Sequence, residues 1–219
     1  MSAVDPSFAA FNYVPPDLVA QQGQDGDKDL VPEARPTYPM RKVAIAGHSY
    51  AGRFQLEKRL YQPGNLIVRR FAKPGGTIDR FRASGAWEAL VNWKPDFTFL
   101  ILGGNDITDG LDVHQLVGRL ADVVLEVERE TGGRCHIVGI ECRDNPRNIS
   151  PHDFKKVKNA VNKSLRRVYR IKGRYTPMQF YHEYLSWDGV HLDNRGSTKL
   201  LQHLLREVRR YYDIVSETP

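Results

Sequence analysis

Short apolar runs alternate with longer segments of helical spacing once the chain has passed Met40. The apolar runs cover residues 43–46, 66–68, 97–102 and 136–140. Each run is short, contains β-branched residues and is closed by a glycine or a polar residue, which is typical of a strand buried on both faces of a parallel sheet. We therefore predict a strand at each of these four places.

Apolar residues at helical spacing mark three longer segments. Two of them cover residues 113–127 and 154–168, and a third follows Gly196. The second is preceded by Ser150 and Pro151, a capping residue and a residue suited to the first helical turn. Strands that alternate with helices predict an α/β fold, here a three-layer α/β/α sandwich of the flavodoxin-like kind with a parallel sheet of about five strands. Functional residues of such folds lie at the carboxyl ends of the strands.

The first 40 residues differ from the rest in composition. They are rich in Pro, Gln, Asp and Gly, and such a stretch buries too little apolar surface to offset the entropy lost on ordering. We predict a flexible N-terminal arm over residues 1–40, in which Phe8, Phe11 and Tyr13 could dock onto a folded domain. That domain covers residues 41–215.

The overall composition is that of one folded domain with some additional chain. Of the 219 residues, 41% are hydrophobic and 10% aromatic, and a single core usually serves roughly 100 to 200 residues. No run approaches the roughly 18 to 20 apolar residues that span a bilayer, and the N-terminus lacks the basic start and apolar stretch of a signal peptide. We expect a soluble, cytoplasmic protein without a membrane span.

The two cysteines and seven histidines carry no metal signature. Cys135 and Cys142 are seven positions apart and would point to opposite faces of a strand, so we expect no disulfide between them. They also lack CxxC spacing, and the histidines are scattered along the chain. We therefore expect neither a metal nor a cofactor.

The net charge of +6 is concentrated in one stretch of the chain. A solvated helix face is the simpler interpretation, but the same charge would suit nucleic acid or another anionic partner. The basic residues of this stretch are Lys155, Lys156, Lys158, Lys163, Arg166, Arg167, Arg170, Lys172 and Arg174.

Four short stretches carry groups suited to catalysis: AGHS from Ala46, KPGGTIDRF from Lys73, LGGND from Leu102 and WDGVHL from Trp187. Each has a simpler explanation when taken singly, because a serine after a strand is often a cap, paired glycines often form a turn, and a lone histidine is usually structural. Each stretch, however, follows a predicted strand or lies in the last loop. Their joint placement therefore predicts a single site at one edge of the sheet.

Acyl transfer needs a nucleophile, a base, an acid that orients the base, and donors for the developing oxyanion. Ser49 supplies a hydroxyl, and His191 and Asp188 lie three positions apart, close enough for the carboxylate to hold the imidazole. Asn105 offers an amide donor, and Gly75 offers a backbone N–H with no side chain to obstruct a substrate. The prediction is a triad of Ser49, His191 and Asp188. Its oxyanion hole would consist of Ser49 (its own N–H), Gly75 and Asn105.

This assembly resembles the SGNH hydrolases, also called the GDSL esterase and lipase superfamily. The Ser, Gly, Asn and His of that family are matched in order by Ser49, Gly75, Asn105 and His191, with Asp188 completing the DxxH pattern. The match extends over the predicted domain, and GGND and DGVHL are its most specific pieces. The resemblance implies a serine esterase that hydrolyses a small acyl ester, for example an acetyl ester, through an acyl-enzyme.

The chain departs from the family pattern at one position and leaves one assignment open. His48 stands where the family usually has Asp, and we interpret it as a histidine hydrogen-bonded beneath the site, with a second-base role as the alternative. The oxyanion glycine is Gly75, or Gly76 if the alignment slips by one. We interpret Asp106 as structural and Thr77 as the cap of a helix.

Other protein classes fit the sequence less well. GHSYA is close to the GxSxG nucleophile elbow of the α/β-hydrolases, but that elbow usually follows several strands, and its acid and histidine lie far apart in the chain. A nucleotide-binding fold would need GxGxxG or a lysine-bearing phosphate loop, and the sequence has neither.

The same motifs are similar to those of SGNH-type domains found in some invertebrate retrotransposon proteins. This resemblance, together with His48 and the long arm, motivates an alternative to the esterase. In that alternative the chain is a weakly active or inactive binding module that associates with nucleic acid through the basic stretch.

Overall fold

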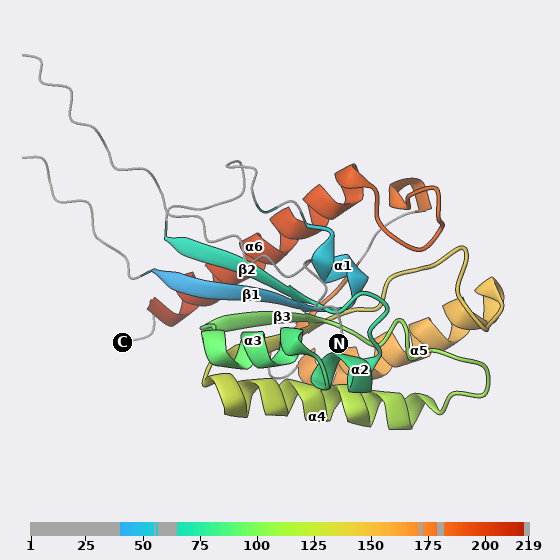
Figure 1. Ribbon diagram of the computed structural model, residues 1–219, viewed down its shortest axis with the longest axis horizontal. Helices are drawn as coiled ribbons and strands as arrows, with labels where there is room; N and C mark the ends of the chain where they lie inside the picture. The colour runs from blue at the N-terminus through green and yellow to red at the C-terminus, as the bar shows by residue number, and fades with distance from the viewer. Residues whose placement is uncertain (1–39, 55, 57–64, 171–172, 179–181, 217–219) are drawn as a thin grey trace, which may run out of the picture. The chain divides into compact units, whose positions relative to one another are not determined.

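The middle layer of the fold is a five-stranded sheet in which every strand pair is parallel (Figure 1). The computed structural model describes residues 40–54, 56, 65–170, 173–178 and 182–216. The strand order is β2-β1-β3-β4-β5, the order of flavodoxin-like sheets. The strands are β1 (Arg41–Gly47), β2 (Leu66–Ala72), β3 (Phe97–Ile101), β4 (Arg134–Val138) and β5 (Tyr175–Thr176).

Helices cover both faces of this sheet, which confirms the predicted three-layer sandwich (Figure 1). One face carries α1 (Ser49–Gly52) and α6 (Asn194–Ser216). The other carries α2 (Ile78–Arg82), α3 (Gly85–Trp93), α4 (Val113–Thr131) and α5 (Pro151–Arg170). A short 3-10 turn, η2 (His182–Tyr184), precedes α6.

The sheet is buried on both faces, because successive residues of each central strand point into different cores. In β1, Val43 and Ile45 pack in the core under α6, whereas Ala44 and Ala46 pack in the core under α4 and α5. All four side chains are fully buried. This is why β1 reads as an unbroken apolar run rather than as an alternating one.

Two predicted helix starts are confirmed by their caps. The Ser150 hydroxyl accepts a hydrogen bond from the backbone N–H of Asp153 at 3.1 Å, and Pro151 is the first residue of α5. The Thr77 hydroxyl accepts from the backbone N–H of Arg80 at 3.4 Å and caps α2. Both caps satisfy donors that the first turn of a helix leaves without partners.

The structure differs from the prediction mainly at the margins of the sheet. Strand β2 continues to Ala72 rather than ending at residue 68. The apolar pattern stops early because β2 is an edge strand, in which the Arg69 and Arg70 side chains are exposed. Strand β5 has only two residues, too few for a sequence pattern. Helix α3 was not anticipated, since only Ala86 and Leu90 of its residues are buried.

The predicted arm of residues 1–40, with Phe8, Phe11 and Tyr13, lies outside the described residues except for Met40, so it stays a prediction. Cys135 and Cys142 are both free thiols. Among the described residues, no helix combines the length and apolarity needed to cross a membrane.

Candidate active site

Three loops leave the sheet at the same edge, and each brings one of the predicted site residues. The strand register places Gly47 of β1 level with Ala72 of β2 on one side and with Ile101 of β3 on the other. The loops that follow these three strands lead to Ser49, Gly75 and Asn105. The carboxyl ends of the strands therefore gather these residues, as the alternating pattern predicted.

The turn out of β1 depends on Gly47. Its φ is +137°, and a Cβ built at this position would lie 2.0 Å from the carbonyl oxygen of Ile101. The next backbone N–H, that of His48, donates to the same carbonyl at 3.1 Å. Only glycine allows this close approach of two neighbouring strands, and the turn delivers Ser49 as the first residue of α1.

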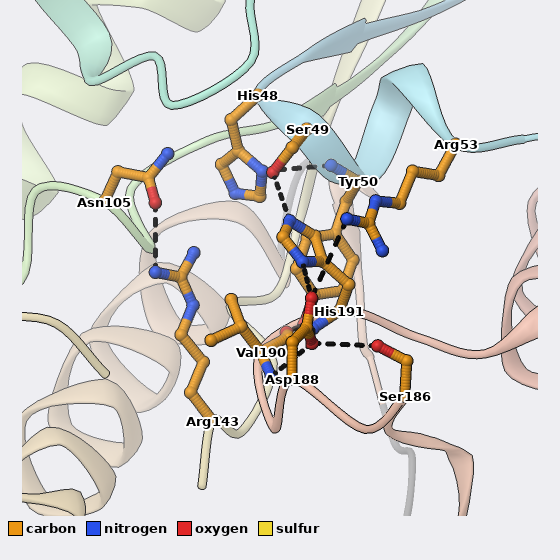
Figure 2. A network of polar contacts seen from close by, with 10 residues as sticks. All are labelled: His48, Ser49, Tyr50, Arg53, Asn105, Arg143, Ser186, Asp188, Val190 and His191. Atoms are coloured by element: carbon orange, nitrogen blue, oxygen red, sulfur yellow. Dashed lines mark hydrogen bonds and ion pairs between the residues drawn. The ribbon is translucent and has the colours of Figure 1, made fainter. Parts of the chain in front are cut away.

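The Ser49 hydroxyl, the His191 imidazole and the Asp188 carboxylate form a continuous hydrogen-bonded line (Figure 2). Ser49 Oγ lies 2.7 Å from His191 Nε2, and His191 Nδ1 lies 2.6 Å from Asp188 Oδ2. The imidazole is thus positioned to take a proton from the hydroxyl while the carboxylate fixes its tautomer.

The Asp188 carboxylate is held by donors from its own loop. Its Oδ1 accepts from the Ser186 hydroxyl at 2.8 Å and from the backbone N–H groups of Val190 and His191, each at 2.9 Å. Burial works to raise the pKa of Asp188, but the hydrogen bonds from His191, Val190 and Ser186 outweigh it and hold the pKa well below its ordinary value. Asp188 is therefore ionised at neutral pH.

The His191 imidazole is held neutral. Burial lowers its pKa, and the positive charges of Arg53 and Arg143 act in the same direction, while the bond to Asp188 opposes them; the net pKa is below the ordinary value. A neutral imidazole with Nδ1–H directed at Asp188 leaves Nε2 as an acceptor facing Ser49.

His48 lies beneath the serine and acts as the N-cap of α1. Its Nδ1 accepts a hydrogen bond from the backbone N–H of Tyr50 at 3.4 Å, and its side chain is buried. Burial first, then the charges of Arg143 and His191, lower its pKa to about 3. These contacts agree with the interpretation of His48 as a neutral hydrogen-bonded residue beneath the site. Its low pKa does not favour a role as second base.

The Asn105 side chain is oriented from both ends. Its Nδ2 donates to the Gly76 carbonyl at 2.9 Å, and its Oδ1 accepts from Arg143 Nη1 at 3.0 Å. Because a guanidinium can only donate, Oδ1 must face Arg143 and the NH₂ group must face Gly76. The second hydrogen of that NH₂ group remains for an acceptor in the cleft that Asn105 lines.

Two neighbours of Asn105, Gly76 and Asp106, bear on roles considered in the sequence analysis. The backbone N–H of Gly76 donates to the Lys73 carbonyl at 2.9 Å, whereas Gly75 is exposed and lines the cleft. The Asp106 carboxylate accepts from the backbone N–H of Ile78 at 3.1 Å and so ties the Asn105 loop to the start of α2. This contact agrees with the structural role predicted for Asp106.

A cleft of about 750 Å³ opens beside the hydrogen-bonded line. Ser49, His191, Gly75 and Asn105 all line it. Among the described residues there is no cluster of three or more His, Cys, Asp or Glu side chains that could hold a metal ion. The site therefore offers a hydroxyl, a neutral base and N–H donors around one space large enough for a small organic molecule.

Sequence reasoning missed Arg53, Arg143 and Tyr50, which border the line in Figure 2. Arg53 Nη2 lies 3.7 Å from Asp188 Oδ2, and the Tyr50 hydroxyl donates to the Val190 carbonyl. The closeness of Tyr50 and Arg53 to Ser49 in the sequence was the only indication that they lie near the site. Arg143 comes from the loop between β4 and α5 and had no signal of its own.

Most of the predicted basic stretch falls on α5. Its exposed side chains are those of Lys155, Lys156, Lys163, Arg166 and Arg167, whereas Lys158 Nζ contacts the Cys142 sulfur at 2.9 Å and Arg174 pairs with Glu128 at 3.1 Å. Lys172 lies outside the described residues. The association of this stretch with nucleic acid stays a prediction.

Solved structures of lipases and esterases share this fold. A GDSL-like lipase from Bacteroides thetaiotaomicron matches 78% of this chain and 89% of its own, with 15% identity and a TM-score of 0.62. A lipase/acylhydrolase from Enterococcus faecalis matches 78% of this chain and 97% of its own, with 17% identity and a TM-score of 0.59. An acetylxylan esterase from Geobacillus stearothermophilus matches 78% of this chain and 94% of its own, with 18% identity and a TM-score of 0.55.

No protein-family model and no curated protein sequence matches this chain. At identities below 20%, the similarity to the solved structures concerns the fold. The chain has the fold of the SGNH, or GDSL, hydrolases, which confirms the resemblance in fold that the motifs predicted.

Proposed function

We propose that this protein is a serine esterase that hydrolyses a small acyl ester through an acyl-enzyme. The observation that carries the proposal is the line from Ser49 Oγ through His191 to Asp188, with distances of 2.7 and 2.6 Å. This line borders an open cleft at the carboxyl edge of the sheet, in a fold that solved lipases and esterases share.

The first half of the proposed reaction transfers the acyl group to the enzyme. Ser49 Oγ forms a bond to the ester carbonyl carbon while His191 Nε2 takes the hydroxyl proton, and Asp188 stabilises the imidazolium that results. The tetrahedral intermediate then expels the alcohol, which receives the proton from His191. The product of this half is an ester of Ser49.

The second half releases the acid. A water molecule gives a proton to His191 Nε2 and bonds to the acyl carbon, and the new tetrahedral intermediate collapses with return of the proton to Ser49 Oγ. Free acid leaves and the serine is restored. The two proposed half-reactions need no metal and no cofactor. We therefore expect activity to survive exhaustive chelation.

The proposed oxyanion donors are the backbone N–H groups of Ser49 and Gly75 and the Asn105 NH₂ group. Gly75 is preferred over Gly76 because the Gly76 N–H already donates to Lys73. The positive φ of Gly75, +64°, belongs to the turn that exposes it to the cleft. Donors fixed in place before the reaction stabilise the developing charge without having to reorganise.

The acyl group is proposed to be small, with acetyl as the first choice. The fold is shared with an acetylxylan esterase, which makes acetyl esters suitable first substrates. A chromogenic acetate ester and a fluorophosphonate probe, which labels an activated serine, test the proposal together.

We expect the probe to label the wild-type protein and not Ser49→Ala, and acetate ester turnover to fall by about 10³-fold or more in Ser49→Ala. The double variant Ser49→Ala/His191→Ala should lose little beyond that, because the residues act as a unit. Ser164→Ala on α5, away from the cleft, is the matched control and should be labelled normally. Equal turnover by wild type and Ser49→Ala would falsify the proposal.

A further inference from the structure

The cleft beside Ser49 is lined by far more positive than negative charge. Four arginines contribute to its walls: Arg53, Arg80, Arg143 and Arg147. Among the described residues that line it, the one carboxylate is Asp188, which already accepts hydrogen bonds from Ser186 and His191. The positive charge of this cleft is therefore not balanced by the wall residues that the structure describes.

Within the described part of the chain, three of these arginines differ from others in the fold by having no acidic partner. No ion pair there joins Arg80, Arg143 or Arg147 to a carboxylate. Elsewhere the arginines of helices and loops are commonly paired. Examples with a carboxylate oxygen within 3.8 Å are Arg53, Arg82, Arg119, Arg174 and Arg210.

Arg143 and Arg147 lie on the same loop, between β4 and α5. Burial works to lower the pKa of Arg143, and the charge of Arg147 acts in the same direction, whereas Tyr50, Asp106 and Asp188 act to raise it; the net pKa is below the ordinary value. Arg143 uses Nη1 to hold Asn105, and its guanidinium lies over the Phe154 ring with 5.5 Å to the centroid. A guanidinium has five N–H donors, so Arg143 retains donors for a further acceptor.

We propose that the alcohol part of the ester substrate carries an anionic oxygen group, a carboxylate or a phosphate, which Arg80, Arg143 and Arg147 bind. This inference rests on the proposed esterase function. A small acyl group would fill little of a cleft of about 750 Å³, and the arginines line the same space that remains for the alcohol part. The planar fork of a guanidinium matches the paired oxygens of carboxylates and phosphates.

The chemistry of the cleft explains why a neutral alcohol would suit it less well. A neutral group placed against these guanidinium groups would remove water from them without supplying an acceptor of equal strength. An oxyanion group would replace that water and also offset the repulsion between Arg143 and Arg147. The same cations would attract an anionic substrate from solution, an effect that weakens with salt.

The test compares acetate esters that share a phenyl ring and differ in charge. The substrates are methyl 4-acetoxybenzoate, which is neutral, 4-acetoxybenzoate, and 4-acetoxyphenyl phosphate. Each enzymatic kcat/KM is divided by the rate of the same ester in hydroxide, which removes differences in intrinsic reactivity. We expect one of the two anionic esters to be favoured over the neutral ester by about tenfold or more, and the favoured ester separates carboxylate from phosphate recognition.

The variants Arg147→Gln and Arg80→Gln should each lower that preference by about tenfold, mainly through KM. Arg129→Gln is the matched control, since Arg129 is an exposed arginine of α4 that pairs with Glu130 outside the cleft. It should keep the full preference. A preference of one or below in the wild type, unchanged in Arg147→Gln, would overturn the inference while leaving esterase activity in place.

A binding measurement separates this inference from the proposed function. Phenyl phosphate and benzoate are titrated calorimetrically into Ser49→Ala and into Ser49→Ala/Arg147→Gln, with benzyl alcohol as the neutral comparison. If the wild type cleaves no ester while Ser49→Ala binds an anion in a way that depends on Arg147, the anion site is retained and the esterase is rejected. Ester cleavage that depends on Ser49, without anion binding or preference, would reject the anion site alone. If no ester cleavage depends on Ser49 and no anion binding depends on Arg147, both the esterase and the anion site are rejected.

Discussion

The hydroxyl of Tyr50 donates a hydrogen bond to the backbone carbonyl of Val190. Tyr50 follows Ser49 on α1, and Val190 precedes His191, so this bond joins the two backbone segments that carry the hydroxyl and the imidazole (Figure 2). Burial raises the pKa of Tyr50, and the phenol therefore stays protonated and able to donate at neutral pH. The bond helps to set the distance between Ser49 and His191.

Tyr50→Phe keeps the ring and removes this donor. We expect the free energy of unfolding to fall by about 1 to 2 kcal/mol and acetate ester turnover to fall by about tenfold, because a small displacement of a catalytic group is costly. Urea unfolding and steady-state kinetics measure the two effects. Tyr211→Phe, in which the ring packs on Phe97, is the control. Full turnover by Tyr50→Phe would contradict the role given to this bond.

Asn105→Ala removes the proposed side-chain donor of the oxyanion hole. We expect kcat to fall by about 10² to 10³-fold with little change in KM, because the donor acts on charge that develops in the transition state. Arg143→Lys keeps a cation but loses the planar fork that holds Asn105 Oδ1, so a smaller loss of kcat should follow. A change confined to KM in Asn105→Ala would contradict the proposed role.

The lowered pKa of His191 predicts the acid limit of activity. The base works only when neutral, so activity should be lost as the pH falls through a value below the ordinary histidine pKa of about 6.5. Arg53→Gln removes a cation that lowers this pKa and that also pairs with Asp188. Both effects raise the pKa of His191, and the acid limb of kcat/KM should move to higher pH. Arg82→Gln, paired with Glu126 on α4, should leave the limb in place.

Two buried histidines predict a loss of stability in acid. Burial first, and then nearby arginines, lower the pKa of both His48 and His136 to about 3. Between pH 6.5 and 3 the unfolded chain binds a proton at each histidine and the folded chain does not. The free energy of unfolding should therefore fall with decreasing pH across this window, by up to about 1.4 kcal/mol per pH unit for each histidine.

Chemical unfolding at several pH values measures this slope. His136→Gln should reduce it by the share of one histidine, whereas His114→Gln, at an exposed position on α4, should not alter it. The slope is compared rather than the stability itself, so a general loss of stability in His136→Gln does not affect the conclusion. An unchanged slope in His136→Gln would contradict the assignment.

Gly47→Ala tests the turn that presents the serine. A Cβ at Gly47 would lie 2.0 Å from a backbone oxygen at a φ of +137°, so we expect a loss of at least about 3 kcal/mol in the free energy of unfolding. Gly118→Ala on α4 is the matched control, since a Cβ there meets nothing within 4 Å. Its helical position predicts a gain of about 0.5 to 1 kcal/mol. Similar stabilities for the two variants would contradict this account.

The sequence was informative about the fold wherever an element is long and buried on a regular pattern. Strands β1 and β3 are unbroken apolar runs, and helices α4, α5 and α6 have apolar positions that repeat with the helical period. Strand β5 has two residues, and β2 carries exposed arginines in its second half. Such elements exist because of their neighbours in the sheet, and a local pattern does not record those neighbours.

For the candidate site, the sequence indicated the groups that the proposed reaction requires. It did not indicate the residues that hold those groups in position. Ser49, Asp188 and His191 could be named because their spacing and the strand ends limit where they lie. Arg143 reaches Asn105 from an irregular loop of residues 139–150, and the conformation of such a loop is set by tertiary contacts rather than by periodicity. The hydrogen bond of Tyr50 spans 140 positions and is equally invisible in the sequence.

Asp188 and His191 share one short loop, closed by the antiparallel bridge between Leu185 and Leu192 and by the bond from the Ser186 N–H to the His191 carbonyl at 2.7 Å. Ser49 belongs instead to α1, directly after β1. A swing of that loop would carry imidazole and carboxylate together as one piece, already oriented for proton uptake. The proposed acid–base pair is thus assembled within one loop, and its contact with the serine depends on how that loop docks against α1, where the bond from Tyr50 to Val190 holds it.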